Sequence, residues 1–258
     1  MQSANQKEAG AKAPMSDAEK QTRIELAACY RLAAHYKMTD TIYTHISARV
    51  PNEPGHFLIN PYGFMWEEIT ASSLVKIDVD GNKIDASPHR VNPAGFTIHS
   101  AVHMGRHSAA WVMHTHTRSG FAVSCLEEGL LPLSQIALQY YSQVGYHDYE
   151  GIALDLDERG RIVDALGDNV ALILRNHGLL TVGETAGQMF SNMFYLNRAC
   201  EIQESALSMG RPLKKIDDAI IKRVSEQFGQ MAYDDGDLLL EWDAQVRLAD
   251  RLDPGFRE

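Results

Sequence analysis

The chain has 258 residues, of which 45% are hydrophobic, and its formal net charge is −10. This length suits one α/β domain, and the acidic balance argues against nucleic acid or an anionic membrane as a partner, because both bind basic surfaces. The three cysteines form no Cys-x-x-Cys pair, which is typical of a reducing compartment. Since no apolar stretch is long enough for a secretory signal or a bilayer span, we expect a cytoplasmic protein.

The first element expected is a helix that begins at Ser16. Ser16 and Glu19 have the spacing of a capping box, and apolar residues then recur at helical intervals as far as Tyr36. Residues 1–15 are polar and are expected to be a disordered leader. Because no long Pro/Gly/Ser linker interrupts the remainder, residues 16–258 are expected to form a single domain.

Short β-rich segments follow the helix at residues 43–50, 56–60 and 75–79. The last of them alternates apolar and polar residues before Asp80-Gly81, which is a hairpin signal, so residues 82–84 are expected to begin a return strand. Neighbouring segments of this kind predict a sheet that is largely antiparallel.

Helices and strands interleave through the rest of the chain. Strands are expected at residues 109–115 and 170–174, and helices at 94–106, 118–126 and 184–209, followed by two shorter helices. The closing segment, 242–256, is expected to be helical and to pack on a neighbouring subunit. The order of elements predicts the α/β class.

Two histidines follow an apolar strand, in the sequence Val112-Met113-His114-Thr115-His116. Strand side chains alternate with period two, so His114 and His116 share a face and stand about 7 Å apart along the strand, close enough to converge on one ion. Taken alone, the pair could also be ordinary polar residues at a strand end.

A third histidine strengthens the metal interpretation. His177 follows the apolar segment 170–174 and precedes Gly178, which permits a sharp turn. Three neutral imidazoles suit zinc first, with manganese, iron, nickel or copper as alternatives, and they leave positions open for water or substrate. The competing interpretation is three hydrogen-bonded core histidines.

The other histidines carry weaker hypotheses. His99, His103 and His107 repeat every fourth residue and so lie along one side of a helix. We expect His99 or His103 to form hydrogen bonds behind the metal ligands, with a second metal as the alternative, and His107 to be solvated. His147 stands among two tyrosines and an aspartate, which makes it a catalytic candidate, with loop packing as the alternative.

The sequence resembles the class II aldolase/adducin superfamily from about residue 20 to about residue 210. The resemblance depends on five motifs in this order: Thr44-His45-Ile46-Ser47, Asn60-Pro61-Tyr62-Gly63, Asn92-Pro93-Ala94-Gly95-Phe96, His114-Thr115-His116 and Asn176-His177-Gly178. It implies a three-layer α/β/α fold whose central, mainly antiparallel sheet is flanked by helices. It also implies one divalent metal on His114, His116 and His177, and a homotetramer with active sites between subunits.

One departure from the family concerns the general base. In the sugar-phosphate aldolases a glutamate stands nineteen positions before the first metal histidine, and that position here is Gly95. The chain therefore resembles the adducin-head-like subgroup that lacks this glutamate. A tyrosine that the aldolases lend to a neighbouring subunit would fall near Ile136, and the nearby Tyr140 and Tyr141 are the candidates to replace it, with packing as the alternative.

A second departure concerns phosphate binding. The resemblance places His45, Tyr62-Gly63 and Pro93-Ala94 where the aldolases carry their phosphate-binding turns, so most of the expected donors to phosphate are absent. We therefore expect a non-phosphorylated substrate. The residues expected to bind it are His45, Asn60, Tyr62, Gly63 and Gly95.

These features favour a metal-dependent lyase that cleaves a carbon–carbon bond. A metal with open positions polarises a carbonyl and stabilises an enolate, which would serve retro-aldol cleavage or decarboxylation of a small carbonyl or hydroxy-acid substrate. The alternatives are a non-haem iron oxygenase at the same site and a non-catalytic assembly module like the adducin head.

Overall fold

The computed structural model describes residues 15–232 and 235–258, and the predicted leader lies almost wholly outside these ranges. The elements, in chain order, are α1 (Asp17–His35), β1 (His45–Arg49), β2 (His56–Ile59), η1 (Trp66–Glu68), β3 (Val75–Asp78), α2 (Pro93–Gly105), β4 (Trp111–Thr115), α3 (Arg118–Ser124), α4 (Gln135–Leu138), β5 (Val144–His147), α5 (Glu158–Leu166), β6 (Ala171–Leu174), β7 (Gly178–Gly183), α6 (Ala186–Ser208), α7 (Asp218–Ala232), α8 (Asp235–Leu252) and η2 (Pro254–Arg257).

The strands form one seven-stranded sheet in the order β3-β2-β1-β4-β7-β6-β5. Every neighbouring pair is antiparallel except β5 and β6, which run parallel. The predicted mainly antiparallel sheet is therefore confirmed. The predicted return strand at residues 82–84 is wrong, because only an isolated bridge between Ile77 and Lys83 forms there.

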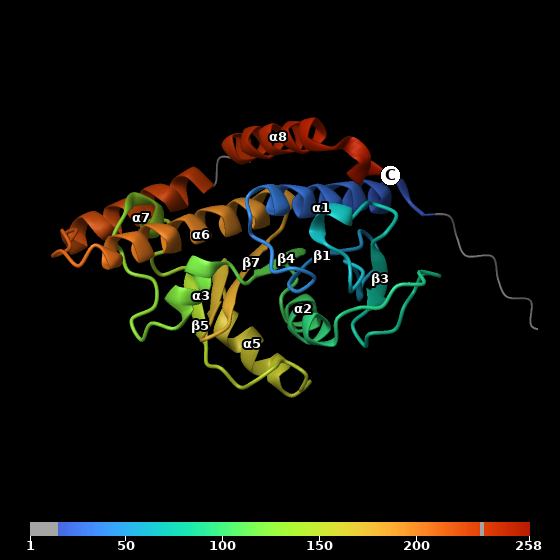
Figure 1. The fold of residues 1–258 in the computed structure, drawn as a ribbon, viewed down its shortest axis with the longest axis horizontal. Coiled ribbons are helices and arrows are strands. Elements are labelled where there is room, and N and C mark those ends of the chain that lie inside the picture. Colours follow the sequence, from blue (N-terminus) through green and yellow to red (C-terminus); the bar gives the residue numbers. More distant parts are fainter. Residues whose placement is uncertain (1–14, 233–234) are drawn as a thin grey trace, which may run out of the picture.

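Helices cover both faces of the sheet, as the three-layer prediction requires. Figure 1 shows α1, α6 and α8 on one side and α2 and α5 on the other. Each side has its own apolar core, with Leu26 and Met193 fully buried in the first and Val112 and Ile162 fully buried in the second. Burial of this kind supplies about 25 cal/mol per Å² of apolar surface and holds the layers together.

The closing segment packs on its own chain, whereas the sequence predicted that it packs on a neighbouring subunit. Trp242 of α8 lies against Gly187 of α6, where a Cβ atom would come within 2.9 Å of the Trp242 Cβ. Phe256 is fully buried in the core beside α1, and Asp253 forms an ion pair with Arg31 at 2.7 Å. Helical periodicity shows which face is apolar but does not show which core that face joins.

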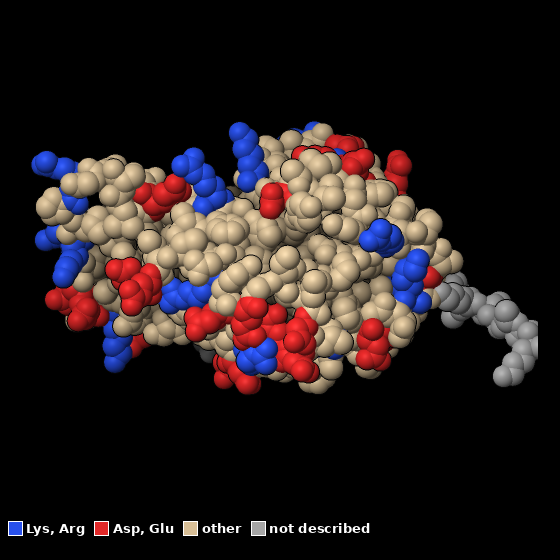
Figure 2. All heavy atoms as spheres, turned by 60° about the horizontal axis from the view of Figure 1, so that its bottom comes forward, with Lys and Arg blue, Asp and Glu red and all other residues tan. Residues whose placement is uncertain are grey.

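The described surface carries charge of both signs. On the face drawn in Figure 2, Asp and Glu side chains gather into clusters, and Lys and Arg are scattered among them and toward one end. Within the described ranges, no helix is both long and apolar enough to cross a membrane.

Candidate metal centre

The first two candidate ligands are placed by β4 and its neighbours. His114 pairs with Leu180 of β7 on one side and with His45 of β1 on the other. Directly paired residues of an antiparallel sheet point to the same face, and the His45 and His114 rings accordingly stack with centroids 5.3 Å apart. His116 lies just past the end of β4, and its ring centroid is 4.8 Å from that of His114.

The third candidate, His177, is brought in by a tight turn between β6 and β7. Asn176 adopts a left-handed conformation with φ of 56°, which asparagine tolerates better than most residues. Gly178 is required because a Cβ atom there would lie 2.4 Å from the carbonyl oxygen of Thr115. The turn places the His177 ring centroid 4.7 Å from that of His114 and 4.9 Å from that of His116.

The hydrogen bonds of His114 and His116 fix which ring nitrogens face inward. Nδ1 of His114 donates to the carbonyl oxygen of Leu179, and Nδ1 of His116 donates to the carboxylate of Asp40, each at 2.9 Å. A neutral imidazole has one N–H, so both Nε2 atoms carry lone pairs. These two atoms lie only 3.0 Å apart.

Two lone pairs at hydrogen-bonding distance repel each other unless a cation lies against both of them. One nitrogen from each of His114, His116 and His177 falls within a group whose atoms are all within 4.8 Å of one another. Imidazole nitrogens about 2.0 to 2.1 Å from a zinc ion would have separations of this order. The donor set therefore fits a divalent metal, and Asp40 orients His116 as carboxylates behind metal ligands commonly do.

The electrostatics of the site keep these rings neutral. Burial lowers the pKa of His114 well below its ordinary value, and His177, His116, His45 and His99 lower it further. Burial, followed by His116 and His147, lowers the pKa of His177 to about 4. Neutral rings are the form that binds a metal, so these two side chains need not lose a proton at neutral pH before they bind one.

His45 lies in the space that a side chain at position 95 would need. A Cβ atom added to Gly95 would lie 2.4 Å from Cδ2 and 2.6 Å from Nε2 of His45. The same ring forms a 3.1 Å hydrogen bond through Nδ1 to Nε2 of His99. His99 or His103 was expected to bond behind the metal ligands, but His99 bonds instead to His45 and Ser47, and neither of these is a candidate ligand.

The remaining predicted substrate-binding residues lie at the adjoining strand ends. Ser47 pairs with Ile59, and this register brings the end of β2 to the His45 end of β1. Asn60 is 4% exposed and its Oδ1 lies 2.9 Å from the Tyr30 hydroxyl, so its amide nitrogen is the group left to donate to a ligand.

Tyr62 and Gly63 follow in the loop after β2. Tyr62 is half-buried, with its ring centroid 6.5 Å from that of Tyr43 and the Arg90 guanidinium 5.9 Å from its ring. Gly63 is exposed and left-handed, with φ of 104°. These contacts leave Tyr62, with its hydroxyl, as the polar side chain that this loop can offer to a ligand.

The three catalytic candidates fall in different environments. Tyr140 is buried in the core and its hydroxyl donates to the carbonyl oxygen of Asn192 at 2.8 Å, which favours the packing alternative. Tyr141 is 45% exposed. His147 ends β5, is buried, and lies 3.0 Å from a carboxylate oxygen of Glu158.

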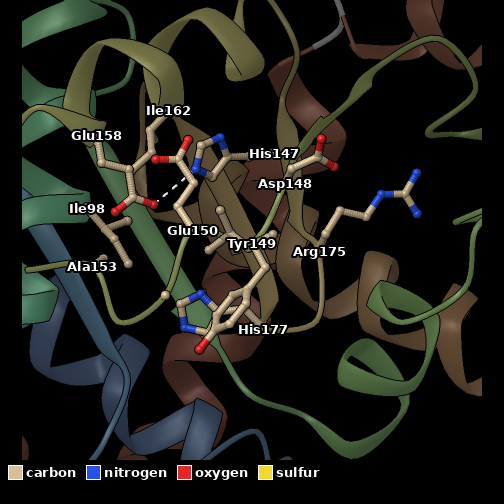
Figure 3. A pocket seen from close by; sticks show the side chains of 12 residues that line it. Ile98, His147, Asp148, Tyr149, Glu150, Ala153, Glu158, Ile162, Arg175 and His177 are labelled. Carbon is tan, nitrogen blue, oxygen red and sulfur yellow. Dashed lines mark hydrogen bonds and ion pairs between the residues drawn. The ribbon is translucent and has the colours of Figure 1, made fainter. Parts of the chain in front are cut away.

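Figure 3 shows a hollow that both His147 and the candidate ligand His177 line. Its lining includes Asp148, Glu158 and Arg175 as well as these two histidines. Of the three catalytic candidates, His147 therefore lines the same hollow as a candidate metal ligand.

The sequence did not indicate two side chains that support the histidines. Asp40, which orients His116, lies 76 residues away in the sequence and belongs to no motif. Glu158, which pairs with His147, opens α5, a helix that the apolar pattern did not reveal. Neither contact leaves a signal in local spacing.

Comparison with known proteins identifies the family. The sequence profile described as "Class II Aldolase and Adducin N-terminal domain" matches residues 24–204. The chain belongs to this family. A Caulobacter vibrioides protein, described only as an aldolase class 2 protein, shares 52% identity with it over 249 residues, which are 96% of each chain.

Further relatives include both branches of the class II aldolase and adducin family. Rat alpha-adducin is 42% identical over 252 residues, which cover 93% of this chain but only 34% of the adducin. The crystal structure of an aldolase II superfamily protein from Pseudomonas syringae aligns with a TM-score of 0.91 and 46% identity, covering 95% of this chain and 98% of that one. L-fuculose 1-phosphate aldolase from Glaciozyma antarctica aligns with a TM-score of 0.81 and 25% identity, covering 96% and 97%.

Proposed function

We propose that this protein is a metal-dependent lyase that cleaves a carbon–carbon bond in a small, non-phosphorylated carbonyl or hydroxy-acid substrate, by retro-aldol cleavage or decarboxylation. The observation that carries the proposal is the 3.0 Å approach of the Nε2 lone pairs of His114 and His116 beside His177. Such an arrangement suits one divalent ion, and zinc is the ion we propose. Family membership supports the same chemistry, since solved relatives include an L-fuculose 1-phosphate aldolase.

A metal held by His114, His116 and His177 would supply Lewis acidity, polarising a substrate carbonyl and stabilising the enolate form of the substrate. The chain's own residues would then hold and orient that substrate. His45 presents Nε2 beside Gly95, and Asn60 presents its amide nitrogen. Tyr62 lies in the loop beside them and would contact the part of the substrate farther from the metal.

An assembly module is the second candidate function. Its support is the 42% identity to rat alpha-adducin together with glycine at position 95. A module of this kind has no need for three imidazole nitrogens within 4.8 Å of one another. We therefore place the lyase first and keep the iron oxygenase as an outcome that metal analysis would reveal.

Elemental analysis of the purified protein, followed by an assay, tests the proposal. We expect about one zinc or manganese ion per chain, and loss of that ion in His114→Ala but not in His107→Ala, whose ring is exposed and belongs to no metal group. Release of carbon dioxide from oxaloacetate, used as a simple β-keto acid, would support the lyase. Iron with oxygen uptake would favour the oxygenase, and a protein without metal or turnover would favour the module.

We also propose a cytoplasmic homotetramer. The measurement is the mass in solution by light scattering, which should be about four times the chain mass of 28.8 kDa. A monomeric mass would contradict this part of the proposal without affecting the metal assignment.

A further inference from the structure

A chain of buried polar side chains leads away from the metal centre between β1 and α2. Nδ1 of His45 lies 3.1 Å from Nε2 of His99, Nδ1 of His99 lies 2.5 Å from Oγ of Ser47, and Oγ of Ser47 lies 2.8 Å from Nε2 of His103. His99 and Ser47 are fully buried, and His45 and His103 are 4% and 6% exposed. We call these four residues the histidine chain.

Each link of the histidine chain has room for one hydrogen atom. A serine hydroxyl has one hydrogen to donate, and a neutral imidazole has one N–H and one bare nitrogen. If Nε2 of His45 carries a hydrogen, its Nδ1 is bare and accepts from Nε2 of His99. His99 then accepts from Ser47, and Ser47 accepts from Nε2 of His103, so all three rings are Nε2–H tautomers. If Nε2 of His45 is bare, all three rings are Nδ1–H tautomers.

The two ends of the histidine chain lie in different surroundings. His45 stacks on His114, and its Nε2 edge faces Gly95. At the other end, Nδ1 of His103 is buried without a hydrogen-bond partner of ordinary geometry in the described part of the protein, although the Ala109 backbone is close enough to favour a proton there. His103 is 6% exposed whereas His99 is fully buried, so His103 is the end of the histidine chain that lies away from the metal centre and nearer to the surface, although its Nδ1 atom is covered.

We propose that the histidine chain is a proton relay from solvent to the substrate, with His45 as the catalytic acid in the place that Gly95 leaves free. The proposal rests on the lyase function above. In decarboxylation the carbon–carbon bond breaks, carbon dioxide leaves, and the bonding electron pair remains on the substrate as an enolate. Its carbon takes the proton from Nε2 of His45.

The histidine chain then returns to neutrality along its length. His99 gives its Nε2 hydrogen to Nδ1 of His45, Ser47 gives its hydrogen to Nδ1 of His99, and His103 gives its Nε2 hydrogen to Ser47. One proton from solvent then reaches Nδ1 of His103, and because this atom is covered in the structure, it must enter by a local opening beside His103. One proton enters and one leaves, so every ring is neutral before and after, but all three rings end as Nδ1–H tautomers. The starting tautomers return after product release, when water in the emptied site gives a proton to Nε2 of His45, the hydrogens shift back along the three links, and Nδ1 of His103 releases its proton. Retro-aldol cleavage needs the same delivery of a proton to the enolate carbon.

The shared tautomer is a test that needs no substrate. Solid-state NMR of sedimented protein labelled with ¹⁵N-histidine distinguishes the two tautomers regardless of oligomer size. We expect His45, His99 and His103 to be neutral and to hold the same tautomer in the metal-free protein. Ser47→Ala should uncouple His103 from the other two rings. Ser100→Ala is the matched control, because this buried serine of α2 bonds only to backbone oxygens of its own helix.

Turnover gives the second test in the zinc-loaded protein with oxaloacetate. We expect His45→Ala to lower kcat by about 10²- to 10⁴-fold, the range of general acid catalysis, with zinc content unchanged. Ser47→Ala, which acts only through His45, should lower kcat by a smaller factor without raising KM, and Ser100→Ala should change neither.

The outcomes separate the relay from the proposed lyase. Mixed tautomers in the native protein, or tautomers that Ser47→Ala leaves coupled, would overturn the relay whatever the activity. If oxaloacetate is not turned over while the three rings share a tautomer that Ser47→Ala breaks, the proposed reaction fails and only the coupled hydrogen-bonded chain stands.

Discussion

The imidazole of His45 fills the space beside Gly95, so that a methyl group at position 95 would lie 2.4 Å from the ring. Glycine here is required by the neighbouring side chain, because its backbone has no positive φ to explain it. Glycine at this position of α2 is thus tied to the presence of a histidine on β1. The two positions should behave as a coupled pair.

Gly95→Ala should therefore destabilise the protein by about 1 to 3 kcal/mol, the usual cost of overpacking a core. Urea denaturation of the metal-free protein measures it. Gly160→Ala on α5 is the control, because nothing lies within 4 Å of an added Cβ there and the alanine should be neutral or slightly stabilising. In a His45→Ala background, Gly95→Ala should lower the free energy of unfolding by less than it does in the native protein. An unchanged cost would show that His45 is not what excludes a side chain.

Asp40 should matter for metal affinity although it is not a candidate ligand. Its carboxylate fixes the Nδ1–H tautomer of His116 at 2.9 Å and so points Nε2 at the metal position. Asp40→Asn should weaken zinc binding by about 10- to 100-fold, as measured by competition with a chromogenic chelator. Asp155→Asn, in the exposed loop before α5, should leave the affinity unchanged. Equal affinities for the two variants would mean that Asp40 does not orient the ligand.

The sequence predicted the sheet and the three candidate ligands because both leave local signals. The apolar run before His114 and the His-x-His spacing follow from strand alternation, and the turn at His177 is marked by Gly178. The strands β5 and β7 were not predicted. β7 follows the His177 turn directly and contains two glycines, so its pattern merges with that of the turn.

The partners of the histidines lie beyond what spacing can show. Whether Asp40 meets His116, or Ser47 joins His99 to His103, depends on strand register and on where α2 packs across the sheet. The same limit applies to the closing helix: its sequence predicts which face is apolar but does not predict which surface that face packs against. Long-range pairing is set by the complete core and not by any one segment.

The closing segment should contribute strongly to the stability of the single chain. Phe256 is fully buried in the core beside α1, so Phe256→Ala should lower the free energy of unfolding by about 3 to 5 kcal/mol. Leu240→Ala on α8 is the control, because Leu240 is 68% exposed and its truncation should cost little. Thermal and urea unfolding at several protein concentrations would measure both. A Phe256→Ala cost that appears only at concentrations where subunits associate would support packing on a neighbouring subunit instead.

The buried histidines should make the metal-free protein sensitive to acid, and His103 offers a clean case because it touches none of the candidate ligands. Burial, with a smaller effect from Arg49, lowers its pKa to about 3 in the folded state, while the unfolded side chain titrates near 6.5. Between these values the unfolded chain binds the extra proton, so the folded state loses stability as the pH falls.

His103→Gln should remove one such group and reduce the slope of stability against pH by at most about 1.4 kcal/mol per unit between about pH 6 and pH 3.5. Urea denaturation across this range in the presence of a chelator measures the slope, and His107→Gln, whose ring is exposed, is the matched control. The slope of stability against pH is the informative quantity. The substitution also removes the packing of His103 on Phe57, whose ring centroids are 4.7 Å apart, but that loss lowers stability equally at every pH. If His103→Gln and the native protein lose stability in parallel as the pH falls, His103 takes up its proton at the same pH in the folded and the unfolded chain, which would contradict a lowered pKa in the fold.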